Sequence, residues 1–130
     1  MFKKIVLATV LTVSLNVFAH EGHDEAPGSL KANHGGTVKK GKDINLEYVV
    51  SGSEVKLFPL SHEGQDLPLA EVKLTATSKL PKGKAVPSKL EVKDSAYVTE
   101  IDFKEAYRVE MNVDASHKGK KSSFKFQVEK

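Results

Sequence analysis

The chain has 130 residues, of which 28% are charged and none is cysteine, and its formal net charge is +3 at pH 7. This length suits one domain, and the missing cysteines exclude thiol nucleophiles, thiolate metal sites and iron–sulfur clusters. Without the lysines of an expected leader the net charge falls to +1, so composition does not favour nucleic-acid binding.

Residues 1–19 have the three parts of a signal peptide. Lys3 and Lys4 provide the positive start, residues 5–18 form a mostly apolar run, and Val17 and Ala19 occupy the −3 and −1 positions. A membrane span needs about 20 apolar residues, and this run is shorter. We therefore predict cleavage after Ala19 and a mature protein in the periplasm, without stable membrane insertion.

Residues 20–34 come next and contain glycine, proline, serine and asparagine but few large apolar groups. Such composition buries too little surface to offset the entropy of ordering. We predict a flexible His-containing tail over 20–34, followed by a β-domain over 35–130.

From residue 37 onward the apolar period is close to two. Ile44, Leu46, Tyr48 and Val50 alternate with polar residues, and the same pattern recurs around residues 55–57, 72–76, 90–92, 97–103, 107–113 and 124–128. Alternation of this kind is typical of strands with one face buried. It predicts an all-β domain, an immunoglobulin-like antiparallel β-sandwich of seven or eight short strands, with a small β-barrel as the alternative.

Cleavage after Ala19 would make His20 the first residue of the mature protein. Its free amine and imidazole can chelate one ion together, and His23 can add a second imidazole. Nitrogen-rich ligand sets favour copper(II), with zinc or nickel also possible. His20 and His23 are thus predicted metal ligands, and the alternative is an inert polar spacer.

The other three histidines lie in turns. His34 begins a His-Gly-Gly segment, where glycine allows a sharp turn or a close backbone approach, and it is predicted as an auxiliary metal ligand. His62 and His117 lie in the turns at 61–66 and 114–121. If strands alternate in direction, these two turns share one end of the sandwich and His34 lies at the other, about 20 Å away. Whether His62 and His117 contribute to a site is left open, since Lys118, Lys120 and Lys121 oppose a cation there.

Two lysine-rich loops, at residues 79–84 and 118–121, could contact an acidic partner or anionic lipid. No nucleophile elbow, phosphate loop or His-Glu-x-x-His segment occurs, so we predict that the protein is not an enzyme.

The segment HGGTVKKGKDINLEYVVSGSEVKLFPLSHEGQDLPL resembles the start of small periplasmic proteins and domains associated with heavy-metal efflux systems, and YRVEMNVDASHKGKKSSFKFQVE resembles their closing hairpin. The resemblance implies a periplasmic β-sandwich with a role in metal binding or transfer. Only His34-Gly35-Gly36 and the leader histidines His20 and His23 carry over. The chain has no coiled-coil hairpin or lipoyl-like domain, which puts direct bridging of an efflux pump in doubt.

Together these features predict a soluble periplasmic protein that captures or transfers a divalent transition metal through its N-terminal tail. A component of a metal efflux system is the expected partner. The alternative is a non-enzymatic structural or protein-interaction sandwich with an inert tail.

Overall fold

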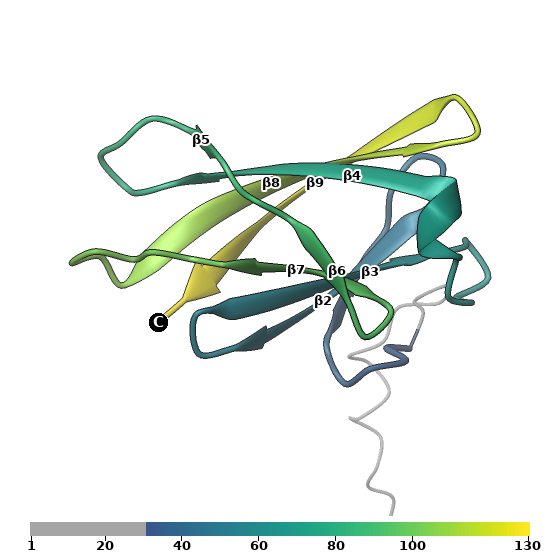
Figure 1. The fold of residues 1–130 in the computed structure, drawn as a ribbon, viewed down its shortest axis with the longest axis horizontal. Helices are drawn as coiled ribbons and strands as arrows, with labels where there is room; N and C mark the ends of the chain where they lie inside the picture. The colour runs from purple at the N-terminus through teal and green to yellow at the C-terminus, as the bar shows by residue number, and fades with distance from the viewer. Residues whose placement is uncertain (1–30) are drawn as a thin grey trace, which may run out of the picture.

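The computed structural model describes residues 31–130, which form two antiparallel sheets (Figure 1). The first sheet has the strand order β1-β2-β3-β7-β6 and the second β5-β4-β8-β9. The strands are β1 Thr37–Lys39, β2 Asn45–Ser51, β3 Glu54–Leu60, β4 Val72–Lys79, β5 Val86–Pro87, β6 Glu91–Lys93, β7 Ala96–Glu100, β8 Arg108–His117 and β9 Lys120–Glu129. One short 3-10 helix, η1 Leu69–Glu71, precedes β4.

The predicted sandwich is confirmed, and the closed-barrel alternative is wrong, because each sheet has two free edges. The described residues form nine strands, against the seven or eight expected. The additional strand is β5, which is only two residues long and pairs with the end of β4. A segment this short carries too little alternation to be recognised in a sequence.

The main core lies between the two sheets, as the period-two pattern requires. In β9, Phe124, Phe126 and Val128 are buried while the residues between them are exposed. The rings of Tyr48 and Phe126 stack with centroids 3.8 Å apart and so join β2 to β9 across the core. The sheets are also tied by Tyr97, whose hydroxyl donates a hydrogen bond of 2.6 Å to the carbonyl of Val72.

A second apolar cluster lies on the outer face of the β1-β2-β3-β7-β6 sheet. Phe58 and Leu60 of β3 and Ala96 and Val98 of β7 are buried there, on the face opposite to Leu57 and the main core. The expectation that each strand turns one face to water is therefore wrong for this sheet. Part of its outer face is covered by the chain that precedes β1.

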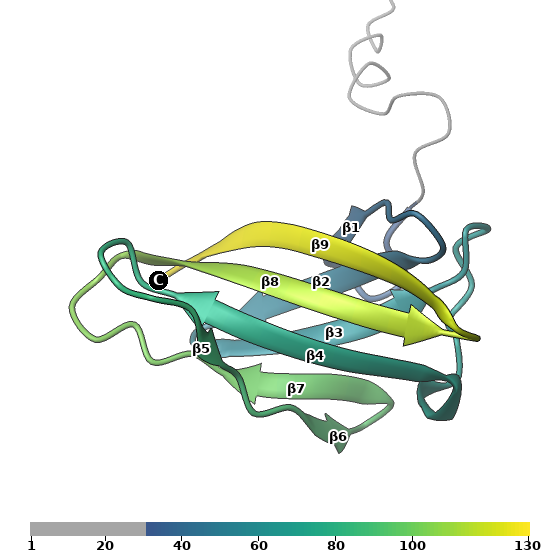
Figure 2. The same cartoon turned by 90° about the horizontal axis from the view of Figure 1, so that it is seen from above.

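Three loops meet at one end of the sandwich, on the right in both views (Figures 1 and 2). They are the β1–β2 loop at residues 40–44, the β3–β4 connection at 61–71 and the β8–β9 turn. The turns that carry His62 and His117 thus share an end, as predicted from strand direction. The Ser122 hydroxyl fixes the β1–β2 loop here by accepting hydrogen bonds from the backbone N–H groups of Asp43 (2.8 Å) and Ile44 (3.2 Å).

Candidate functional site

The chain before β1 is held on the sheet by one buried carboxylate, that of Glu47. Its side chain is fully buried and accepts hydrogen bonds from the backbone N–H groups of Asn33 (2.9 Å), His34 (2.8 Å) and Gly36 (2.9 Å). A buried carboxylate requires such partners, because an unpaired charge in the interior is very costly. Asn33 and His34, which the sequence assigns to the tail, are therefore held on the domain.

The two glycines after His34 have the roles expected of them. Gly35 has φ = +79°, a left-handed conformation that glycine adopts without strain. Gly36 lies so close to β2 that a Cβ atom there would overlap the carbonyl oxygen of Tyr48 and lie 2.7 Å from Val49 Cγ2. The His-Gly-Gly sequence thus lets the chain reverse and press against β2.

The His34 ring is fixed by two neighbours. It stacks on Phe58, with ring centroids 3.7 Å apart and planes 9° apart. Its Nε2 lies 3.0 Å and 3.1 Å from the two carboxylate oxygens of Asp66. The Asn33 side-chain amide donates to the same carboxylate at 3.2 Å and to the Gly64 carbonyl at 2.8 Å. The pair remains open to solvent, since the side chains of His34 and Asp66 are 29% and 52% exposed.

The prediction that His34 lies at the opposite end from His62 and His117 is wrong. Strand β1 has only three residues and pairs with Leu46–Tyr48 in β2, so it does not cross the sandwich. The chain reverses at Gly35, and this reversal places His34 beside Asp66 in the β3–β4 connection. The prediction from alternating strand directions failed because it assumed a first strand that runs the full length of the sandwich.

His62 and His117 also contact the β1–β2 loop, each through a different group. His62 Nε2 lies 3.3 Å from the Gly41 carbonyl oxygen. His117 Nδ1 lies 3.2 Å from Asp43 Oδ2, and its Nε2 is buried, 3.9 Å from Glu71 Oε1 and without a hydrogen-bond partner in the described chain. These contacts join loops to one another and give both histidines a structural role.

Of the three predicted ligands, only His34 can be placed. His20 and His23 lie outside the described residues, as does the predicted signal peptide at 1–19. Within residues 31–130, no group of three or more histidine, aspartate or glutamate side chains has the geometry to hold a metal ion. The His34–Asp66 pair can therefore supply two donors from the domain, and any further donors must come from elsewhere.

Two residues of this site were missed by sequence reasoning. Glu47 follows the alternation of β2 and was expected to face water, whereas it is fully buried under residues 33–36. Asp66 was predicted only as the last residue of the turn at 61–66. No local pattern marks either residue, because both acquire their roles from a segment more than ten residues away in sequence.

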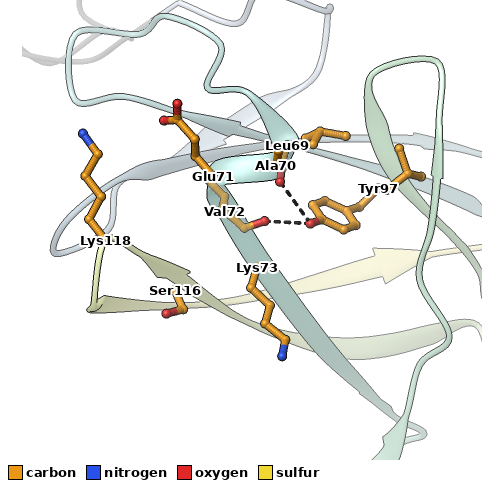
Figure 3. A pocket seen from close by; sticks show the side chains of 9 residues that line it. Leu69, Ala70, Glu71, Val72, Lys73, Tyr97, Ser116 and Lys118 are labelled. Atoms are coloured by element: carbon orange, nitrogen blue, oxygen red, sulfur yellow. Dashed lines mark hydrogen bonds between the residues drawn. The ribbon is translucent and has the colours of Figure 1, made fainter.

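One pocket of the described domain lies apart from His34. It is lined by residues of η1, the start of β4, β6, β7 and the end of β8, and Figure 3 shows Lys73, Ser116, Lys118 and Glu71 around it. The Tyr97 hydroxyl beside it is used by backbone carbonyls. We assign no ligand to this pocket by itself.

Comparisons with known proteins support the fold alone. No model of a known protein family matches the chain, and no curated protein matches its sequence. A crystal structure of a DUF4426 family protein from Pseudomonas aeruginosa PAO1 is similar, with a TM-score of 0.57 and 16% identity over 75% of this chain and 96% of that one. At such low identity the likeness supports a common sandwich architecture. Within residues 31–130, no helix is long and apolar enough to cross a bilayer.

Proposed function

We propose that this chain is a periplasmic metal-binding protein that captures a divalent transition metal, with copper(II) favoured over zinc and nickel. The observation that carries the proposal is the His34–Asp66 pair, an imidazole and a carboxylate held 3.0 Å apart on the surface where the His-containing segment joins the domain. His20 and His23 are the proposed principal ligands, and His34 with Asp66 is the domain-borne part of the site.

The spacing of the pair suits two neighbouring ligands of one ion. Metal–nitrogen and metal–oxygen bonds of about 2.0–2.1 Å at an angle near 90° place the two donors roughly 2.9 Å apart. Tetragonal copper(II) has such angles. An ion would bind the deprotonated Nε2, so a proton held between this nitrogen and Asp66 should be released on binding.

The chain length allows the tail ligands to meet this pair. Ten residues separate His23 from His34, and an extended chain spans up to about 3.5 Å per residue, on the order of 35 Å in all. A site completed by a chain segment of this kind can exchange its ligands, which suits capture and transfer of an ion. The resemblance to domains of heavy-metal efflux systems supports such a system as the partner, and we propose no catalytic step.

The test is a calorimetric titration of copper(II) and zinc into the processed protein and three variants. Replacing His20 and His23 together with alanine should weaken copper(II) binding at least a hundredfold. Replacing Asp66 with asparagine should weaken it about tenfold, because a carboxylate ligand is lost while the His34 ring remains.

His62→Ala is the matched control, since His62 is an exposed histidine at the same end of the domain, and its affinity should equal that of the parent. Equal weak binding by the parent and the His20→Ala/His23→Ala variant would overturn the tail as a metal site. An unchanged copper(II) affinity in Asp66→Asn would show that Asp66 is not a ligand, and would leave the proposal for the tail histidines standing.

N-terminal sequencing of the secreted product gives a simpler test. We expect His20 as the first residue, because Ala19 and Val17 fit the signal-peptidase positions. A start at any other residue would remove the amine chelate from the proposal and leave only imidazole and carboxylate donors.

One observation favours the second candidate, a non-enzymatic protein-interaction sandwich with an inert tail. Strand β9 is ten residues long and forms an edge of its sheet. Long edge strands can pair with a strand of another protein. Wild-type affinity for metal in every variant above would favour this candidate.

A further inference from the structure

The end of the sandwich where the three loops meet is rich in lysine. The β1–β2 loop carries two exposed lysines, the β8–β9 hairpin carries three, and the start of β4 carries one: Lys40, Lys42, Lys118, Lys120, Lys121 and Lys73. In sequence these residues belong to three separate segments. Only the fold brings the 40–42 loop to the 118–121 turn, so no single loop reveals the size of this cluster, which we call the basic end.

Contacts between the loops fix the basic end. Asp43 joins the β1–β2 loop to the hairpin through His117 (3.2 Å) and through the Ser122 hydroxyl (2.8 Å). In the sheet, Ser116 is the register partner of both Lys73 and Lys121, so these three residues form one row across β4, β8 and β9. Figure 3 shows Lys73, Ser116 and Lys118 in this part of the surface.

The lysines of the basic end form no ion pairs within residues 31–130. Within residues 31–130, none of the six lies within 4.0 Å of a carboxylate oxygen, whereas Lys89, Lys104 and Lys125 do. The same three loops carry four carboxylates, Asp43, Glu63, Asp66 and Glu71, so the six lysines outnumber them by two. The basic end therefore carries an excess of positive charge, although the mature chain is nearly neutral overall.

The arrangement of these cations indicates an extended anionic surface as the partner. The six side chains are exposed and spread over two loops and the start of β4, so they do not converge on one small anion. Protein interfaces are enriched in aromatic residues and arginine and depleted of lysine. Of the exposed large apolar residues of the described domain, Val50, Val86 and Tyr107 do not lie in these loops, and Val92 of β6 lines the pocket beside Lys73 and Lys118. Lysine clusters with few such anchors are typical of proteins that bind anionic phospholipid headgroups through charge.

We propose that the basic end docks the domain reversibly on an anionic phospholipid membrane, without insertion into it. The hairpin lysines would approach the headgroups first, with the β1–β2 loop beside them. This proposal is independent of metal binding, since it uses no residue of the His34–Asp66 pair.

The test measures, by co-sedimentation, how the processed protein binds to two kinds of vesicle. One kind is pure phosphatidylcholine, and the other contains about one third phosphatidylglycerol. Replacing Lys118, Lys120 and Lys121 together with glutamine should weaken binding to the anionic vesicles about a hundredfold, because each lysine near the surface contributes roughly fivefold. The matched control replaces Lys79, Lys82 and Lys84 with glutamine. It removes the same charge from another loop and should weaken binding less than fivefold.

Binding should also fall steeply as salt rises from about 50 to 500 mM, because exposed charges are screened. Equal losses in the two triple variants would overturn the proposal by showing that net charge alone matters. Binding to neutral vesicles, or no binding to the anionic ones, would overturn it as well. The lysines replaced in the two triple variants are all partly or fully exposed. Thermal transitions that match that of the parent would establish that both variants keep the fold.

Discussion

Replacing Glu47 with glutamine is expected to destabilise the domain by about 2–4 kcal/mol. The side chain is fully buried and accepts three backbone hydrogen bonds from residues 33–36. Hydrogen bonds to a charged group are worth about 1.5–3 kcal/mol each, and the loss is not additive. Glutamine keeps the shape but turns an N–H₂ donor toward backbone donors. Urea denaturation followed by circular dichroism measures the change in the free energy of unfolding.

The same substitution should release the segment that carries His34. Amide hydrogen exchange of Asn33, His34 and Gly36 should rise more than that of the core strands, because local opening no longer breaks bonds to a carboxylate. Glu54→Gln is the control: Glu54 also lies on the first sheet, but none of the contacts described for residues 31–130 engages its carboxylate. Wild-type stability and exchange in Glu47→Gln would show that the carboxylate does not hold the segment, and would weaken the case for a preformed His34–Asp66 pair.

The strands were predictable because their cause is local. Alternation in residues 120–129 needs only the sequence Lys-Lys-Ser-Ser-Phe-Lys-Phe-Gln-Val-Glu to indicate which side chains are buried, and the structure buries Phe124, Phe126 and Val128. The two-sheet architecture followed from the number and spacing of such segments.

The candidate site was predictable only in part, because its causes are non-local. His34 was identified from its glycines, yet Asp66 is 32 residues away and Glu47 is 13 residues away. A carboxylate inside an alternating strand is expected to face water, and only the chain reversal at Gly35 buries it. The lysine-rich loop at 118–121 was identified from the sequence, but its place beside the β1–β2 loop was not, because only the contacts of Asp43 with His117 and Ser122 bring the two together.

Replacing Gly41 with alanine is expected to destabilise the domain by about 2–3 kcal/mol. A Cβ atom at this position would overlap the carbonyl oxygen of Ile44 and lie 2.6 Å from Cζ of Phe124. Phe124 is a core residue of β9, so the clash cannot be relieved by a surface side chain, and overpacking of this kind typically costs 1–3 kcal/mol. The β1–β2 loop should move away from the hairpin, with loss of the contacts between Asp43, His117 and Ser122.

Gly83→Ala is the matched control for this prediction. A Cβ atom at Gly83 has no neighbour closer than Leu80 Cβ at 3.5 Å, and the backbone there is not left-handed. Its stability should stay within about 0.5 kcal/mol of the parent, or rise slightly because alanine restricts the unfolded chain. Thermal unfolding of both variants measures the difference. If Gly41→Ala were as stable as Gly83→Ala, the β1–β2 loop would not be packed against Phe124, and Lys40 and Lys42 would no longer be fixed beside the hairpin lysines.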